Sequence, residues 1–272
     1  LGLALYTALF SSCVYEDLSK CSRMFMLQPR YLLHTGEGDR FGEAVHHIDV
    51  YAFDSLGIYR KMFRDKGAHL KNGYQMPIDL PEGKWTFLCL GGKVGDYEIG
   101  IFKTGIPQQF SPAVSPGITT LSDFRVKAYF EQKENLEYSF GELFFGRLDS
   151  VEITADNGGT GVIDLMKNTN KIEVRVKGIA DGSSARITSD NGRFNSENVT
   201  PADAGTIIYV PYYSASQADD TRVFQFDVLR LYTDGHLFLK LLNPDGTDVI
   251  PGFTKDLINT ILRRIWIERI PI

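Results

Sequence analysis

The sequence predicts an all-β protein of two tandem β-sandwich domains followed by a short helix. The 272 residues include 18 Phe, 13 Tyr and 26 Gly but only 2 Trp, a mixture typical of strands and tight turns. Runs of alternating apolar and polar residues recur at regular spacing between turn signals, which is the pattern of a β-sandwich. Two such series, divided near residue 146, indicate two sandwiches.

The composition excludes several classes of protein. Hydrophobic residues make up 43% of the chain, too many for a disordered polymer. Lys and Arg number 29 against 34 Asp and Glu, which gives a formal net charge of −5. Because nucleic-acid-binding domains carry a basic patch or stripe, we expect no nucleic-acid partner.

The chain opens with an uncharged apolar run from Leu1 to Phe10, which has the length of the hydrophobic region of a signal peptide. This run is too short to span a bilayer, which takes about 20 apolar residues. We therefore expect residues 1–12 to be a lipoprotein signal peptide that is truncated at its start.

Cys13 follows this run directly, after the small residues Ser11 and Ser12. Bacterial lipoprotein processing requires small residues before a cysteine whose thiol then takes a diacylglyceryl group. The sequence thus predicts lipidation of Cys13 and a lipidated tether over residues 13–22. The alternative is an ordinary signal peptide with Cys13 in a disulfide to Cys21. The place of Cys13 at the end of the apolar run favours the lipid.

The first sandwich is predicted over residues 23–145. Within it, the alternation from Tyr74 to Leu80 indicates a half-buried strand, and Pro77 in that run indicates a sheet edge or a bulge. The other expected elements are a strand over His47–Phe53, a turn at Asp54–Gly57, a return strand over Ile58–Phe63, a strand over Lys84–Leu90 and a long loop over 104–122.

The second sandwich is predicted over residues 146–272. Its clearest strand has Ile172, Val174 and Val176 alternating with charged residues, which requires one buried and one solvated face. The other expected strands are Ser150–Thr154, Gly161–Leu165, Ala185–Thr188, Thr206–Tyr212, Val223–Tyr232 and His236–Leu242, with a helix over Thr254–Trp266.

Four stretches taken in order resemble a known family. They are Cys13–Leu18 with Cys21–Arg23, the strand and turn from Ile48 to Gly57, Gly83–Phe87, and Val162–Ile172. Over roughly Cys13 to Leu257 the chain resembles the FimB-type fimbrial anchor lipoproteins of Bacteroidales, a group related to the minor-fimbrium anchoring protein.

The resemblance implies two transthyretin-like (Ig-like) β-sandwich domains and attachment to the outer membrane through lipidated Cys13. It also implies a surface-exposed place at the base of a fimbrium, with fimbrial stalk or accessory subunits as partners. One departure is at the C-terminus, where members of the family continue into a further strand after the helix. Here the chain ends in a different segment after Ile265.

No catalytic pattern occurs in the sequence. It has no G-x-S-x-G, H-E-x-x-H or Walker motif, so we expect no enzyme activity, cofactor, metal or small-molecule substrate. His46 and His47 are adjacent in a strand, where successive side chains point to opposite faces. Cys89 lies in an apolar strand and is expected to be a buried free thiol. Asn198 begins an N-glycosylation pattern that a bacterial lipoprotein normally leaves bare.

The leading hypothesis is therefore a non-enzymatic anchor that presents strand edges to a fimbrial subunit. The alternative is a surface glycan-binding lipoprotein of a nutrient-uptake system, which would need exposed aromatic rings as a platform for sugars. Tyr212 and Tyr213 are the candidates for that platform. A lipid-anchored hydrolase ranks last because no catalytic signature is present.

Overall fold

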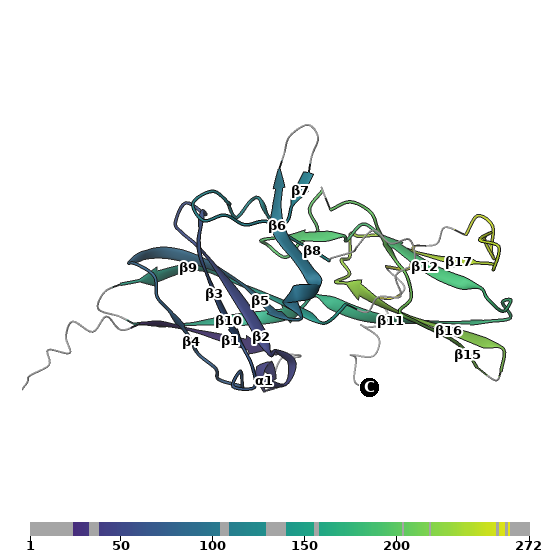
Figure 1. The fold of residues 1–272 in the computed structure, drawn as a ribbon, viewed down its shortest axis with the longest axis horizontal. Coiled ribbons are helices and arrows are strands. Elements are labelled where there is room, and N and C mark those ends of the chain that lie inside the picture. The colour runs from purple at the N-terminus through teal and green to yellow at the C-terminus, as the bar shows by residue number, and fades with distance from the viewer. Residues whose placement is uncertain are drawn as a thin grey trace, which may run out of the picture.

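The structure is a computed structural model that describes residues 24–32, 38–103, 109–128, 140–154, 158–202, 204–217, 219–253, 256–258 and 261. Over these residues the protein is almost entirely β, as the sequence predicts. The strands are accompanied by one short helix, α1 (Phe41–Ala44), and one 3-10 turn, η2 (Val94–Asp96). Figure 1 shows β1 to β5 in one half of the molecule and β12, β15, β16 and β17 in the other.

A seven-stranded sheet forms most of the N-terminal half, in the order β3-β2-β5-β9-β10-β1-β4. Strands β9 and β10 pair at only two positions. Beyond these pairs the sheet bends, so that the layer of β10, β1 and β4 packs across the layer of β3, β2, β5 and β9. The rings of Phe25 and Phe87 stack between these two layers with centroids 6.0 Å apart. The strands are β1 (Phe25–Tyr31), β2 (His47–Phe53), β3 (Tyr59–Lys66), β4 (Met76–Ile78), β5 (Gly83–Gly92), β9 (Leu143–Ile153) and β10 (Thr160–Lys167).

A four-stranded sheet, in the order β13-β8-β6-β7, packs on the other face of β2, β5 and β9. Tyr51 on β2 and Phe124 on β8 meet edge to face, with ring centroids 5.3 Å apart. This sheet joins distant parts of the chain, because β13 pairs with β8. Its strands are β6 (Tyr97–Lys103), β7 (Gln109–Ser111), β8 (Phe124–Ala128) and β13 (Arg193–Asn195).

Two three-stranded sheets form the C-terminal half, in the orders β11-β16-β15 and β14-β12-β17. The strand predicted around Ile172 is confirmed as β11, whose Ile172, Val174 and Val176 pack against the core while the charged residues between them point outward. The strands are β11 (Thr169–Lys177), β12 (Ser184–Ser189), β14 (Ile207–Tyr209), β15 (Tyr213–Ser216), β16 (Thr221–Leu229) and β17 (Leu237–Leu242).

One hydrophobic cluster joins the two halves. It contains Tyr51 and Phe124 from the N-terminal sheets together with Ile187 and Phe226 from the C-terminal sheets. Phe140 and Tyr209 also meet across the halves, with ring centroids 6.4 Å apart. Because apolar burial is the dominant stabilising term in folding, this shared core ties the two halves into one body. A second cluster fills the space under β1 and β4.

The expected division at 145–146 does not coincide with a change of sheet. Residue 146 lies inside β9, which pairs with both β5 and β10. After β9 and β10 the chain leaves this sheet at Asn168, between β10 and β11. Turn signals and alternation mark strands but not their partners, so the parallel pairing of β10 with β1 is not visible in the sequence.

Three smaller expectations have different outcomes. Pro77 lies in β4 at a sheet edge, as predicted. The loop expected over 104–122 contains the short strand β7. Most of the helix expected over Thr254–Trp266 lies outside the described residues. Within them the N–H of Ile261 donates to the carbonyl of Leu257 at 2.9 Å, and no further helix is evident.

Asn168 holds the crossing from β10 to β11 in place. Its side chain is fully buried and exchanges two amide hydrogen bonds with the side chain of Asn198. Its backbone N–H donates to the Leu143 carbonyl at 2.7 Å, and its carbonyl accepts from Arg230 at 2.9 Å. Asn198 has a positive φ of 58°, which asparagine tolerates better than most residues, and its carbonyl accepts from the Tyr232 hydroxyl at 3.1 Å.

This pairing predicts the cost of removing it. Asn168→Ala leaves the buried amide of Asn198 without its partner, which costs about 1–3 kcal/mol of unfolding free energy. Asn170→Ala, at an exposed position two residues away on β11, should change the same quantity by less than about 0.5 kcal/mol. Urea denaturation of the two variants measures both values. Equal effects would show that the amide pair does not stabilise the crossing.

Candidate anchoring and docking sites

The predicted lipidation site lies outside the described part of the chain, as does Cys21. The first described strand, β1, begins at Phe25, twelve positions after Cys13. A fully extended chain of that length spans at most roughly 40 Å. Any membrane attachment at Cys13 therefore acts on the protein through the N-terminal end of β1.

β1 is held along its length by β10. The two strands run parallel, with six residue pairs in register from Met26–Thr160 to Tyr31–Leu165. Arg30 adds a two-pronged ion pair to Asp164 on β10, with N–O distances of 2.5 and 3.0 Å. Leu27 on the other face of β1 is fully buried. The strand nearest the predicted tether is thus fixed by a backbone ladder, a surface ion pair and the core.

His47, His46 and Cys89 lie in different surroundings. The carboxylate of Asp49, fully buried, accepts from Arg64 at 2.6 and 2.7 Å and lies 2.9 Å from His47 Nε2. His46 is exposed. Cys89 is a free, fully buried thiol, and burial raises its pKa. In the described residues no three His, Cys, Asp or Glu side chains come together as a metal site.

None of the helices described here is long and apolar enough to cross a membrane.

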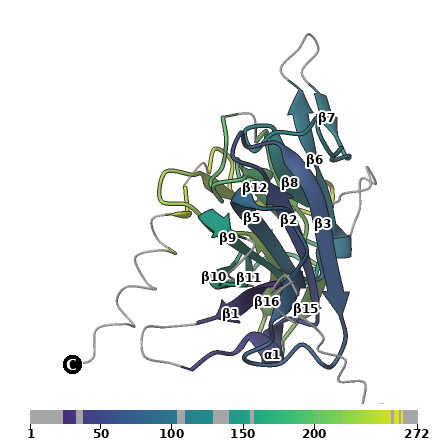
Figure 2. The ribbon, with the colours of Figure 1, turned by 90° about the vertical axis from the view of Figure 1, so that its left-hand side faces the viewer.

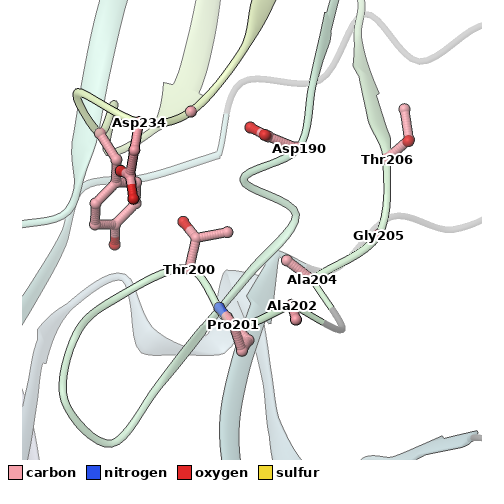
Figure 3. A pocket seen from close by; sticks show the side chains of 10 residues that line it. Asp190, Thr200, Pro201, Ala202, Ala204, Gly205, Thr206 and Asp234 are labelled. Atoms are coloured by element: carbon pink, nitrogen blue, oxygen red, sulfur yellow. The ribbon is translucent and has the colours of Figure 1, made fainter.

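A polar recess of about 340 Å³ opens on the C-terminal half, and Figure 3 shows the side chains around it. Asp190, Thr200 and Asp234 supply most of its polar groups. One Asp190 oxygen already accepts the His236 backbone N–H at 3.0 Å. The described residues that line it include no histidine, lysine, cysteine or serine.

The two tyrosines considered as a platform for sugars lie in different surroundings. The ammonium of Lys171 lies over the Tyr212 ring, 5.0 Å from its centroid, and also contacts the Asp227 carboxylate at 2.8 Å. That hydrogen bond raises the pKa of Lys171. Tyr213 is half exposed. The cation thus occupies one face of the Tyr212 ring, and Tyr213 is the more open of the two.

Strand edges are the remaining candidates for docking a partner, because an edge presents unpaired backbone N–H and C=O groups. The two sheets of the C-terminal half end in β11, β15, β14 and β17, and the sheets of the N-terminal half end in β3, β4, β7 and β13. Figure 2 shows these sheets from the end of the molecule that holds β1. These edge strands differ in length and in how far other segments cover them.

The sequence profile of the fimbrillin-A associated anchor proteins Mfa1 and Mfa2 matches residues 18–270. This chain belongs to that family. Membership gives it a fimbrial anchoring role, in association with fimbrial subunits at the cell surface. The resemblance seen in the sequence is thereby confirmed.

Solved structures share the fold. The fimbrial anchor protein Mfa2 from Porphyromonas gingivalis superposes with a TM-score of 0.72 and 21% identity, covering 89% of this chain and 84% of that one. A candidate adhesin from Bacteroides thetaiotaomicron gives 0.71 and 21%, covering 94% and 87%. A candidate polysaccharide-binding protein from the same species gives 0.69 and 22%, covering 83% and 78%. At these identities the similarity shows the fold and not the ligand. No curated protein sequence matches this chain.

Two ionisable side chains, His236 and Asp256, hold the segment that follows β17 in place. His236 Nδ1 lies 2.7 Å from Asp256 Oδ2, and this hydrogen bond raises the pKa of His236. Burial by itself would raise the pKa of Asp256. Hydrogen bonds from the Ile258 backbone, His236 and the Leu237 backbone outweigh that effect and lower it.

The fastening should therefore depend on pH. The Asp256 contribution is present above about pH 4 and is lost as pH falls, while the His236 contribution is complete below about pH 6.5 and is lost as pH rises through its raised pKa. The Leu257 N–H, which donates to the Leu237 carbonyl at 2.8 Å, should be best protected from hydrogen exchange between these limits. His236→Gln should abolish the decline at higher pH. Unchanged protection of the native protein from pH 6 to 9 would refute this mechanism.

Proposed function

We propose that this protein is a non-enzymatic outer-membrane lipoprotein that anchors a fimbrium at its base and influences fibre assembly and length. The observation that carries the proposal is the family match over residues 18–270. The apolar run that ends at Cys13 supports the lipid attachment. Uncovered strand edges support contact with fimbrial stalk or accessory subunits.

Acyl chains on one cysteine would supply the membrane affinity. Each buried methylene contributes about 0.8 kcal/mol, and a single myristoyl chain binds a membrane only marginally. Two or three chains on Cys13 hold the protein in the bilayer for much longer than one. A lipoprotein with this anchor needs no membrane-spanning helix.

The arrangement of β1, β10 and β11 suits a protein under tension. The tether enters at the N-terminal end of β1, and β10 continues through Asn168 into β11. Tension between the tether and β11 pulls β1 toward its N-terminus and β10 toward its C-terminus. The six parallel residue pairs between the two strands are then loaded in shear. A ladder pulled along its strands loads all its hydrogen bonds together, so we infer that it resists rupture.

A cysteine substitution tests the membrane attachment. Cys13→Ala should remove palmitate labelling and release the mature protein from the outer-membrane fraction, because no acyl chain remains. Cys89→Ala is the matched control, since that thiol is buried in the described core and should leave both readouts unchanged. Membrane retention of the Cys13→Ala protein would contradict the lipid attachment.

Deletion of the protein tests the anchoring role. Cells without it should shed fimbriae into the medium, and the fibres should change in length, as electron microscopy can measure. Fibres of normal length that stay firmly attached to the deletion strain would refute the proposed function.

A further inference from the structure

β11 is the long edge strand that the described structure leaves uncovered. It has nine residues, all paired with β16 on one side. No strand in the described ranges pairs with it on the other side. Figure 1 shows it continuing from β10 along the long axis of the molecule.

The other long edges are covered or blocked. The start of β3 is capped by the loop between β7 and β8, since Tyr59 N–H donates to the Thr119 carbonyl at 2.8 Å and its carbonyl accepts from Gly117 at 2.8 Å. The rest of β3 carries neighbouring charged residues on both faces, which oppose pairing. β17 is covered by the segment that follows it, through Val249 N–H to the Leu241 carbonyl at 3.0 Å and the Leu257 bond described above.

The remaining edges are short. β4, β7, β13 and β14 have three residues each and β15 has four. β4 also contains Pro77, which has no N–H to donate. β11 alone among the described edges offers enough length for an extended partner strand.

The side chains of β11 would recognise an added strand. Ile172, Val174 and Val176 are only partly buried although they pack against the shared core. A neighbouring strand with apolar residues at alternate positions would complete their burial. The opposite face of β11 carries the charge pattern of Lys171, Glu173 and Arg175, followed by Lys177. Lys171 contacts Asp227 and Arg175 contacts Glu173, but both cationic side chains stay 61% exposed and can also reach a neighbouring strand.

The charge pattern opposes a second copy of this chain. Antiparallel self-pairing over the full strand sets Thr169 opposite Lys177, which places Lys171 opposite Arg175 twice and Glu173 opposite itself. Parallel pairing in register sets every charge beside its own copy. Because like charges directly opposite each other destabilise a strand pair, β11 does not favour its own copy in either of these full-length registers.

We propose that β11 is the acceptor edge for an extended strand of a fimbrial subunit, apolar at alternate positions, with carboxylates opposite Lys171 and Arg175 and a cation opposite Glu173. This inference rests on the proposed function and names the edge that it uses. The charges on the partner strand, negative then positive then negative, follow the same order in both directions. The partner strand therefore fits in a parallel or an antiparallel orientation. Backbone hydrogen bonds give the affinity and the side chains give the specificity.

A peptide probe tests the edge directly. The probe has the core Asp-Val-Lys-Val-Asp, flanked by Thr and blocked at both ends, and the control peptide has the core Lys-Val-Glu-Val-Lys. Hydrogen exchange on the full chain should show β11 amides protected by the probe, and the control peptide should bind about tenfold more weakly. Equal protection by both peptides, or protection by neither, would overturn the proposal.

Charge reversal on the protein gives a second test. Arg175→Glu with Lys177→Glu should weaken probe binding about tenfold, since the attraction between Arg175 and the carboxylate opposite it becomes repulsion and the charge of Lys177 beside it is reversed as well. The matched control is Arg186→Glu with Lys240→Glu, an exposed cross-strand pair on β12 and β17 with the same change in net charge. Thermal unfolding checks that both variants fold. Equal losses of binding in the two variants would overturn the proposal.

Cells separate this inference from the proposed function. If the deletion strain and the Arg175→Glu, Lys177→Glu strain both shed fibres, the anchoring function and the β11 edge are both supported. If deletion sheds fibres but the β11 variant retains them as well as the Arg186→Glu, Lys240→Glu control does, the β11 edge is wrong and the anchor stands. If the deletion strain retains its fibres, the proposed function itself fails.

Discussion

The shared hydrophobic core is the interaction on which the rest of the structure depends. Side chains from β2, β8, β12 and β16 meet in one cluster, so the C-terminal sheets share their core with the N-terminal ones, while a second cluster lies within the N-terminal half alone. The buried amide pair of Asn168 and Asn198 sits where the chain passes between the halves. Apolar burial supplies the stability, and the amide pair fixes the register of the crossing because a buried amide is costly to leave without a partner.

This construction lets one chain serve as a connection between two ends. β1 lies at the end that the predicted tether reaches, and β11 lies beyond the crossing, in the other half of the molecule (Figure 1). The same continuous stretch of chain forms both β10, which binds β1, and β11, which presents the open edge. A force applied at one end therefore reaches the other along strands and their ladders, without passing through a hinge between independent domains.

Much of the fold was predictable from local pattern, and the pairing was not. The alternation around Ile172 predicted strand β11 and its solvated face, and Pro77 predicted that β4 lies at a sheet edge. The parallel pairing of β1 with β10 and the antiparallel pairing of β13 with β8 join residues more than 65 positions apart, and nothing in the local sequence encodes a partner at that distance. Asn198 reads as a glycosylation pattern in the sequence but proves to be a buried structural amide. The edge on β11 could be ranked first only after the coverings of β3 and β17 were seen.

Single-molecule pulling tests the central claim, that tension passes from the tether to β11 through the β1–β10 ladder. Handles at Met24 and Lys177 load the six parallel pairs in shear. Handles at Met24 and Asp79 instead open the antiparallel β1–β4 pairing from one end, where Phe25 faces Ile78. The account predicts that the first geometry ruptures at a force several times higher than the second. Rupture at equal forces, or at a lower force between Met24 and Lys177, would contradict it.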